Sequence, residues 1–584
     1  MTHLHTRKPL NITPLLLILL SIAGSLSVLI WGFNKAFDLT DAGYYLLRYQ
    51  DNQPLEAGGF LYDHILIKAM LPNTWRHIIP LRVFGMVLNL VSTLLLSLAV
   101  FSLSKKWGRH TESLKYIFWL IYAGFVFSYA GSPGELSYNT LNQFLIISAA
   151  ALLIISQSSR GAAKLAIIFC AGFLTSISLL IKLPSGLTAA IAGVVFLLFT
   201  AKNRWYALLS FKAGIIFSLA IVYLTVKPDF MEYFITGYLT IGKGNEYGSK
   251  LLIYSLYEIC LRNLYVFLIA FAANLALWFA ALQHKPKIKQ FIQTAVFIIL
   301  AIFFGKSVIQ HFQGSMFVSD TLMFIVYLLV FRLVFSSLSP ASLFPKTSKS
   351  SFTNAKGKAI ALYIRENYQS LAPLIYLLIL PYIGALGTNN PLNWGAKFYY
   401  SATLGALALL SALHYSKLLK ITTCCLAAYL MILGVAQYVQ YPYRSKALYT
   451  QKYAFHGIKL DYNKMQYLQE IESALKDEGF VAEQGIIVAY KNPGLVYLLH
   501  SYHPGGVLWS KETEDAYFAL LQHTSAPMKP LIIGNDKPIT KSFAKKLFSA
   551  TGIIFSTDYR LVKKIRHYEP GKYTYLYLPI AAQK

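Results

Sequence analysis

Residues 37–49 read Phe37-Asp38-Leu39-Thr40-Asp41-Ala42-Gly43-Tyr44-Tyr45-Leu46-Leu47-Arg48-Tyr49 and directly follow a long apolar segment at residues 12–32. That segment has the length that a helix needs to cross a lipid bilayer, about 20 residues. The stretch after it carries two carboxylic acids and a Gly-Tyr-Tyr run at the point where the chain would leave the bilayer. It is therefore predicted to form a loop at the membrane surface around which the rest of the chain is organised.

The composition is too apolar for a soluble globular protein. Of the 584 residues, 56% are hydrophobic and 13% are charged, with a mean hydropathy of +0.49, whereas about a quarter of the residues in a soluble domain are charged. Aromatic residues, at 15%, suit a protein with many membrane–water interfaces. The formal net charge of +28 is interpreted as basic loops beside anionic lipid, and nucleic-acid binding is not expected.

Apolar stretches of spanning length recur along the chain and predict a polytopic α-helical membrane protein with about thirteen transmembrane helices. The first is interpreted as a retained signal anchor, because its length spans a bilayer. The predicted spans are residues 12–32, 80–103, 116–131, 139–156, 165–182, 185–200, 207–226, 260–282, 290–305, 316–337, 371–387, 397–414 and 421–439.

The basic residues between these spans predict the topology. Clusters of Lys and Arg lie in alternate connections, at residues 105–115, 160–164, 202–204, 285–289, 346–358 and 417–420. The positive-inside rule places these connections and the N-terminus in the cytoplasm. The acids of the membrane portion gather in the other connections, so the external face is predicted to be the working face. A bacterial inner (plasma) membrane is the expected location.

The composition changes to that of a soluble domain after Tyr441-Pro442-Tyr443-Arg444. We divide the chain into a transmembrane domain at 1–440 and an extracytoplasmic domain at 441–584. Alternating patterns predict that the second is a small α/β domain. Its expected helices are 462–477, 495–500, 512–522 and 539–549, and its expected strands 485–490, 530–534, 553–556 and 573–578.

Asp38 and Asp41 are the first candidates for chemistry. A carboxylate just past a helix end can accept a proton from a reacting group or bind a divalent cation, and a dry cavity at the membrane surface strengthens either role. The alternative is that both are solvated loop acids, one of which caps a helix that begins near Gly43.

These features together resemble the GT-C fold of glycosyltransferases. The resemblance consists of a cytoplasmic N-terminus, about thirteen helices, the Asp-x-x-Asp-x-Gly-Tyr-Tyr stretch, a long amphipathic first external loop and a C-terminal external domain. The class includes protein O-mannosyltransferases, bacterial aminoarabinose transferases and oligosaccharyltransferase catalytic subunits. It implies an inverting transfer of a sugar from a polyprenyl-phosphate carrier to a glycan, lipid or protein acceptor at the extracytoplasmic face.

The resemblance also assigns roles to individual residues of the stretch. It implies that Asp41, which precedes Ala-Gly-Tyr-Tyr, is the catalytic base, with Asp38 as the alternative. Tyr44 and Tyr45 become candidates for substrate binding. Glu135 lies in the second external loop, where oligosaccharyltransferase subunits carry an Asp-x-Asp metal motif. Because this chain has one acid there, Glu135 is a catalytic or acceptor-contact candidate, and the need for a divalent metal ion stays open.

Cations on the external side run against the positive-inside bias, and a prenyl phosphate would explain them. Such cations neutralise charge that develops on a phosphate leaving group. The alternative is that each snorkels to lipid headgroups. The candidate phosphate ligands are Arg82, Lys182, Lys306, His311 and Lys397.

The loop at residues 387–394 is the second most distinctive connection. Asn389 and Asn390 could hydrogen-bond sugar hydroxyls or diphosphate, and Trp394 could stack on a sugar face. A simple turn is the alternative, since Asn-Asn-Pro favours one. His500 and His503 are interpreted as surface histidines, because their spacing does not resemble a metal site.

Two other functions remain open from the sequence. One is a transporter or flippase of lipid-linked saccharides that makes no bond, for which Asp320 is the main acid expected inside the membrane. The other is a non-catalytic scaffold whose external domain recruits partners. The gathering of acids at one face favours chemistry there over both.

Overall fold

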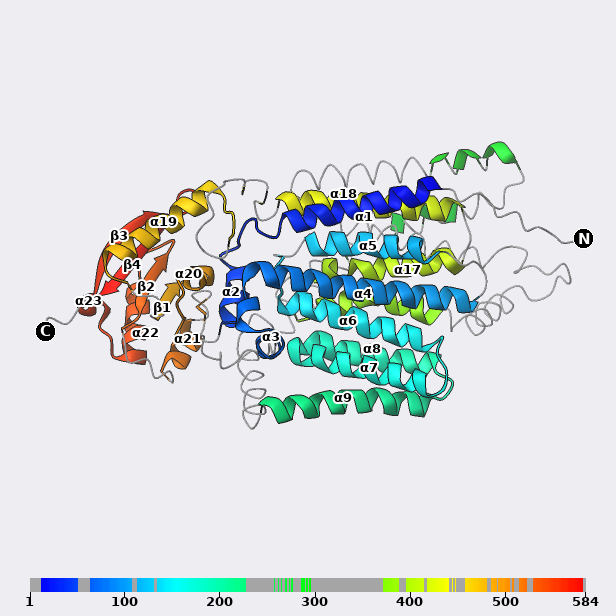
Figure 1. The fold of residues 1–584 in the computed structure, drawn as a ribbon, viewed down its shortest axis with the longest axis horizontal. Helices are drawn as coiled ribbons and strands as arrows, with labels where there is room; N and C mark the ends of the chain where they lie inside the picture. The colour runs from blue at the N-terminus through cyan, green and yellow to red at the C-terminus, as the bar shows by residue number, and fades with distance from the viewer. Residues whose placement is uncertain are drawn as a thin grey trace, which may run out of the picture.

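The computed structural model shows a bundle of helices along the long axis of the molecule, with a domain that contains a β-sheet at one end (Figure 1). The residues that the structure describes are 12–50, 63–107, 113–130, 134–226, 371–387, 395–413, 417–440, 444, 447, 457–480, 485–490, 492–504, 507–508, 514–522 and 529–580, with scattered positions between 257 and 295.

The bundle is built from the apolar segments that the sequence predicts. Its helices are α1 (Ile12–Trp31), α4 (Ile78–Trp107), α5 (Leu114–Ala130), α6 (Tyr138–Ser156), α7 (Gly161–Ile181), α8 (Leu183–Thr200), α9 (Arg204–Val226), the helix Leu371–Ala385, α17 (Tyr400–Leu413) and α18 (Lys417–Gln440).

Six helices among the described residues are long and apolar enough to cross a membrane: α4, α6, α7, α8, α9 and α18. The chain is therefore a multi-pass membrane protein. The predicted spans at 260–282, 290–305 and 316–337 lie largely or wholly outside the described residues, so the predicted total stays untested.

Glycine allows the helices of the bundle to approach closely. A Cβ atom on Gly172 of α7 would lie 2.1 Å from the carbonyl oxygen of Phe211 in α9, and one on Gly214 would lie 2.1 Å from the carbonyl oxygen of Phe169. Any side chain at these two positions would push α7 and α9 apart. This matches the use of small residues at interfaces between membrane helices, where close packing replaces the hydrophobic effect as the driving force.

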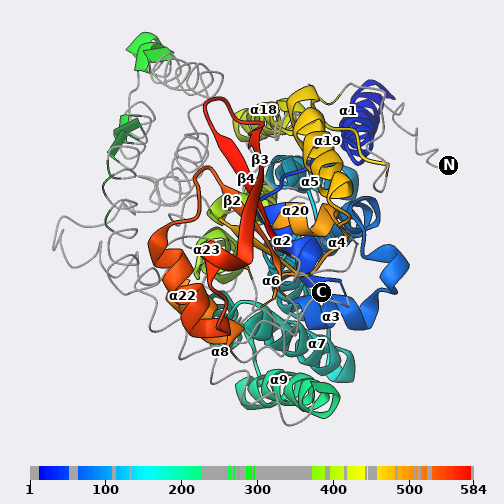
Figure 2. The ribbon, with the colours of Figure 1, turned by 90° about the vertical axis from the view of Figure 1, so that its left-hand side faces the viewer.

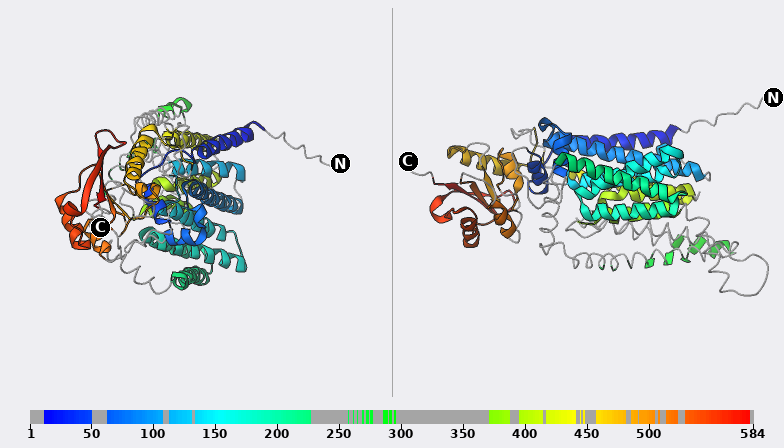
Figure 3. Two further views of the ribbon diagram at one scale, coloured as in Figure 1. Left: turned by 60° about the vertical axis from the view of Figure 1, so that its left-hand side comes forward. Right: turned by 90° about the horizontal axis from the view of Figure 1, so that it is seen from below.

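Three short helices lie between the bundle and the C-terminal domain: α2 (Asp41–Arg48), α3 (Asp63–Met70) and the 3₁₀-helix η1 (Asn73–Trp75). Figure 1 and the right-hand view of Figure 3 place α2 and α3 at the bundle end nearest the sheet. We call this the α2 end and the other the opposite end. The acids Asp38, Asp41, Asp63 and Glu135 belong to the α2 end, and the described basic residues of the clusters at 160–164 and 202–204 belong to the opposite end. The cluster at 346–358 lies outside the described residues.

The C-terminal domain has the expected α/β character. Its sheet has the order β1-β2-β4-β3, in which β1 (Ile486–Ala489) and β2 (Leu531–Asn535) are parallel and the other pairs are antiparallel. The remaining elements are α19 (Tyr462–Asp477), α20 (Pro493–Leu498), α21 (Glu514–Leu521), α22 (Lys541–Thr551), α23 (Phe555–Asp558), β3 (Tyr559–Arg566) and β4 (Tyr573–Pro579). Figure 2 views the sheet and α19 in front of the bundle.

One predicted strand of this domain is wrong. Residues 555–558 form the short helix α23, held by a 2.7 Å hydrogen bond from the Ile554 amide to the Asp558 carboxylate. The strand follows it as β3, which pairs only with β4 at the edge of the sheet. Four of its eight residues are cations, so the strand lacks the alternation of apolar and polar residues that predicts a strand. Charged residues are common in edge strands, because they prevent pairing with other chains.

One hydrophobic core joins the stretch at residues 37–49 to the C-terminal domain. Phe37, Leu39, Leu46 and Tyr49 belong to the same buried cluster as residues of α19, β1, β2 and α20. Residues 34–36 add a parallel bridge to Lys459, with 2.8 Å bonds from the Ala36 amide to the Lys459 carbonyl and from the Lys459 amide to the Asn34 carbonyl. The predicted boundary at residue 441 therefore separates two stretches of sequence that share one core.

Candidate functional site

Helix α2 presents an acid from an otherwise buried element. Its residues Ala42, Gly43, Tyr45, Leu46, Leu47 and Arg48 are buried, whereas the Asp41 side chain in the first turn is exposed. The apolar residues bury themselves in the core shared with the C-terminal domain. Asp41 thus stands on a rigid support and remains accessible to a substrate.

The two acids of the stretch have different surroundings. The Asp38 carboxylate accepts hydrogen bonds from the Thr40 amide, at 3.0 Å, and from the Thr40 hydroxyl, at 2.6 Å. It therefore closes the turn that leads into α2. No described residue donates a hydrogen bond to the Asp41 carboxylate. Of the two acids, Asp41 is the exposed one, and Asp38 is partly buried and held by Thr40.

The environment of Asp41 makes it a better base than an ordinary aspartate. The pKa of Asp41 is raised to about 6. The larger cause is desolvation by the surrounding protein, and the smaller is the negative charge of Asp38. The side chain of Asp41 nevertheless remains accessible. A carboxylate with this pKa holds a proton more strongly than a solvated one, yet is largely ionised at neutral pH. General-base catalysis is most effective when the pKa of the base lies near the working pH.

The C-terminal domain holds the other side of the stretch in place. The Gly494 amide of α20 donates a 2.8 Å hydrogen bond to the Leu39 carbonyl, and Lys464 of α19 donates one of 3.0 Å to the Phe37 carbonyl. A Cβ atom on Gly43 would lie 2.4 Å from the Cα of Gly494. Two glycines therefore bring α2 and α20 into backbone contact beside Asp41.

Arg82, predicted as a phosphate ligand, and Glu135, predicted as a catalytic or acceptor-contact residue, form a buried pair with each other. Arg82 is fully buried, and its Nε donates a 2.8 Å bond to Glu135 Oε1, which its Nη2 also contacts. Its terminal nitrogens donate to the carbonyls of Phe33, Lys35 and Ala36 at 2.8, 3.0 and 2.8 Å. These bonds use all five guanidinium N–H groups, so the pair anchors the chain between α1 and α2 and leaves Arg82 none for a phosphate.

A second buried network was not predicted from the sequence. Arg48 at the end of α2 lies 3.3 Å from the fully buried carboxylate of Asp63 in α3, which also accepts a 2.9 Å bond from the Tyr49 hydroxyl. Arg48 also lies 2.8 Å from His64 Nδ1. One feature of the sequence could have indicated this network: Arg48 is a cation that directly follows Leu46 and Leu47 on the side predicted to be external, where cations are unusual. The network ties the far end of α2 to α3.

Lys182 and Lys397, two of the predicted phosphate ligands, lie at the α2 end of the bundle. Lys182, in the turn between α7 and α8, is buried and donates to Asn139 Oδ1 at 3.3 Å and to the Gly384 carbonyl at 3.1 Å. Lys397 opens the 3₁₀-helix η3 (Lys397–Tyr399).

Tyr138 connects Lys182 to α2. Its ring lies 6.0 Å from Lys182 Nζ and 5.8 Å from the ring of Tyr45. Tyr45 packs in turn on Tyr44, at 5.7 Å. The two tyrosines predicted to bind substrate thus belong to an aromatic row between the acid and a cation, in which Tyr45 is buried and Tyr44 partly accessible.

The remaining predicted ligands lie outside the described residues: Lys306, His311, Asn389, Asn390 and Trp394. Among the described residues no group of three His, Cys, Asp or Glu side chains could hold a metal ion. His503, expected at the surface, is buried and accepts a 3.2 Å bond from the Val488 amide; burial lowers its pKa to about 4. It fills the core behind β1.

Solved structures of two enzymes are similar to this chain. The Archaeoglobus fulgidus oligosaccharyltransferase, in complex with Zn and sulfate, has 12% identity and a TM-score of 0.42 over 93% of this chain and 71% of its own. Two structures of ArnT from Cupriavidus metallidurans each have 12% identity and a TM-score of 0.38. The structure in the apo state covers 97% of this chain, and the structure bound to undecaprenyl phosphate covers 96%. Both matches cover 98% of the ArnT chain.

Both enzymes are GT-C fold glycosyltransferases, the class that residues 37–49 resemble. No protein-family model and no curated protein sequence matches the chain.

Proposed function

We propose that the protein is a membrane glycosyltransferase that moves a sugar from a polyprenyl-phosphate carrier to an acceptor at the extracytoplasmic face, with Asp41 as the catalytic base. The observation that carries the proposal is the state of Asp41: it is accessible, accepts no hydrogen bond from a described residue and has a raised pKa, while every neighbouring element is fixed by buried contacts. The donor class comes from the sequence resemblance.

In the proposed reaction, an acceptor hydroxyl or amine attacks the anomeric carbon of the donor sugar. The bond between that carbon and the phosphate oxygen breaks, and the electron pair leaves with polyprenyl phosphate. Asp41 takes the proton of the acceptor, and attack from the face opposite the phosphate inverts the anomeric centre. A preorganised base on a short, packed helix supplies this step without reorganisation of the loop.

Lys182 and Lys397 are the described cations that we assign to the leaving phosphate. The Lys182 ammonium has three N–H groups, and its two bonds to Asn139 and Gly384 leave one for a ligand. A phosphate beside these lysines would stabilise their charged forms. The tyrosines between Lys182 and Asp41 would contact the sugar, and the polyprenyl tail would lie along the apolar helices.

The test is native mass spectrometry of the protein purified in mild detergent, comparing wild type with Asp41→Asn. Asp477→Asn is the matched control, because Asp477 is an exposed acid at the end of α19. We expect wild type and control to carry a mixture of polyprenyl phosphate and its glycosylated form, and Asp41→Asn to be enriched in the glycosylated form.

Two results would count against the proposal. A protein that retains other lipids but never a prenyl carrier is not using this donor. A glycosylated carrier bound in equal amount by wild type and Asp41→Asn, with no transfer product from either protein, would favour the transporter hypothesis.

A further inference from the structure

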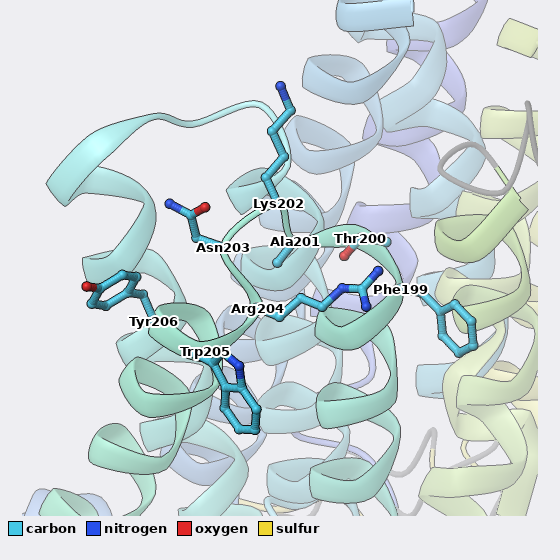
Figure 4. A pocket seen from close by; sticks show the side chains of 8 residues that line it. All are labelled: Phe199, Thr200, Ala201, Lys202, Asn203, Arg204, Trp205 and Tyr206. Carbon is cyan, nitrogen blue, oxygen red and sulfur yellow. The ribbon is translucent and has the colours of Figure 1, made fainter.

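A pocket lies at the opposite end of the bundle, away from every residue of the proposed reaction. It is formed by the turn between α8 and α9, residues 199–206, and has a volume of about 660 Å³. Lys202 and Arg204 leave this turn in different directions, and Arg204 extends toward Thr200 and Phe199 (Figure 4). Known ligand pockets have volumes of roughly 300–1,000 Å³.

Cations from three connections gather around Lys202, one of the residues that line this pocket. Lys202 is close enough to Lys106 at the end of α4 and to Lys164 in α7 to repel both electrostatically, and Arg160 repels Lys106. Lys106 is also held in place by a 2.5 Å hydrogen bond to the Gln157 carbonyl. The positive charges therefore gather around one site and are not spread evenly over the surface.

No described acid balances these charges. Within the described ranges 63–107, 113–130 and 134–226 the acids are Asp63 and Glu135, and both lie at the α2 end. Lys106 is repelled by Lys202 and Arg160, and Lys164 is repelled by Lys106 and Lys202. An anion bound beside Lys202 would relieve this repulsion. An anionic ligand at this turn would meet several cations and no acid among the described residues.

The surroundings of the pocket are apolar and aromatic. Trp205 and Tyr206 are 79% and 66% exposed, and Phe199 is 59% exposed. Large exposed apolar side chains continue from the pocket along α8 and α9, as at Leu198 and Leu209. Amphipathic rings of this kind settle at the headgroup depth of a bilayer. A ligand that suits both features has an anionic head at the turn and apolar chains along the helices.

We propose that this pocket binds the phosphate headgroup of an anionic phospholipid, with Lys202 and Arg204 as direct ligands and Lys106, Arg160 and Lys164 as the surrounding positive charge. Trp205 and Tyr206 lie at the glycerol level, and the acyl chains run along the exposed faces of α8 and α9. This end carries the basic clusters that predict a cytoplasmic orientation, so the lipid belongs to the cytoplasmic leaflet. The proposal is independent of the reaction at Asp41.

The test measures phospholipid binding to the full-length protein in detergent by native mass spectrometry. Phosphatidylglycerol is titrated against phosphatidylcholine for wild type, the pocket variant Lys202→Gln/Arg204→Gln, and the control variant Lys285→Gln/Lys287→Gln. All four positions are exposed, so folding is not at risk, and both variants remove two positive charges. A parallel titration adds inorganic phosphate in excess.

Wild type and control should prefer phosphatidylglycerol, and the pocket variant should lose roughly thirtyfold in affinity for it, since each basic residue near an anionic lipid contributes about fivefold. Phosphatidylcholine binding should not change. Equal losses in both variants, or no preference for phosphatidylglycerol, would overturn the site. Displacement of the lipid by inorganic phosphate would assign the pocket to a soluble phosphate ligand.

Discussion

The two ends of the bundle use charge in opposite ways. At the α2 end, the cations Arg82 and Arg48 are buried and paired with Glu135 and Asp63. At the opposite end, Lys202 and Arg204 are exposed, and no described acid accompanies them. Buried pairs hold geometry, because moving either partner leaves an uncompensated charge. Exposed cations instead stay available to attract a mobile anion. The two arginine pairs of the α2 end thus hold the geometry around Asp41. The exposed cations of the opposite end remain accessible to an anion.

The largest expected effect is on the acid that the α2 end positions. Asp41→Asn should lower the rate of sugar transfer by about 10²–10⁴-fold, the range of a general base, whereas Asp38→Asn should lower it less than about tenfold, because Asp38 acts through the turn. The assay uses the glycosylated carrier that co-purifies with the protein. Equal losses from both substitutions would remove the distinction between the two acids.

The second-largest expected effect is a loss of stability when the buried pair Arg82–Glu135 is broken. Arg82→Gln should lower the free energy of unfolding by about 3–5 kcal/mol, because Glu135 would keep a buried charge without a partner. Arg160→Gln is the matched control at the opposite end; its side chain is exposed, and we expect a change within about 0.5 kcal/mol. Thermal unfolding in detergent measures both. Similar melting temperatures for the two variants would show that the ends do not differ in this way.

A smaller effect is expected where α2 meets α20. Gly43→Ala should destabilise the protein by about 1–3 kcal/mol, because the new methyl group would overlap the backbone of Gly494. Gly24→Ala in α1 is the control, since a Cβ there meets nothing within 4 Å. Thermal unfolding and proteolysis of the C-terminal domain report the change. If Gly43→Ala is as stable as its control, the contact between α2 and α20 is not tight.

The smallest effect is on pH dependence. Because the pKa of Asp41 is raised to about 6, the carboxyl is protonated below that pH and cannot accept a proton. The rate should therefore be half-maximal near pH 6 and fall about tenfold for each further unit of pH below it. Asp38→Asn should move this midpoint to lower pH by less than about one unit, since the charge of Asp38 is the smaller cause. A rate that is constant between pH 5 and 8 would argue against Asp41 as the base.

Local patterns were sufficient for many elements. The helix predicted over 462–477 is α19 with the same bounds, and most apolar segments are helices within a few residues of their predicted ends. Hydropathy and periodicity depend on near neighbours, so they can be read along the chain. The strand β3 was not predicted at its observed position because its charged residues lie at a sheet edge, and a local pattern does not show where an edge will be.

Hydropathy and the order of residues along the chain are enough to predict its membrane character, the separation of acids from cations between its connections, and the position of Asp38 and Asp41 just after the first apolar helix. Which charged side chains are buried in pairs and which are accessible depends instead on contacts that form when the chain folds. The guanidinium of Arg82 donates hydrogen bonds to carbonyls within residues 33–36 and to Glu135. The residues that pack against α2 in its core include many beyond residue 457. Whether a polar group is satisfied depends on partners brought together by folding, often hundreds of residues apart, and their spacing in the chain does not reveal them.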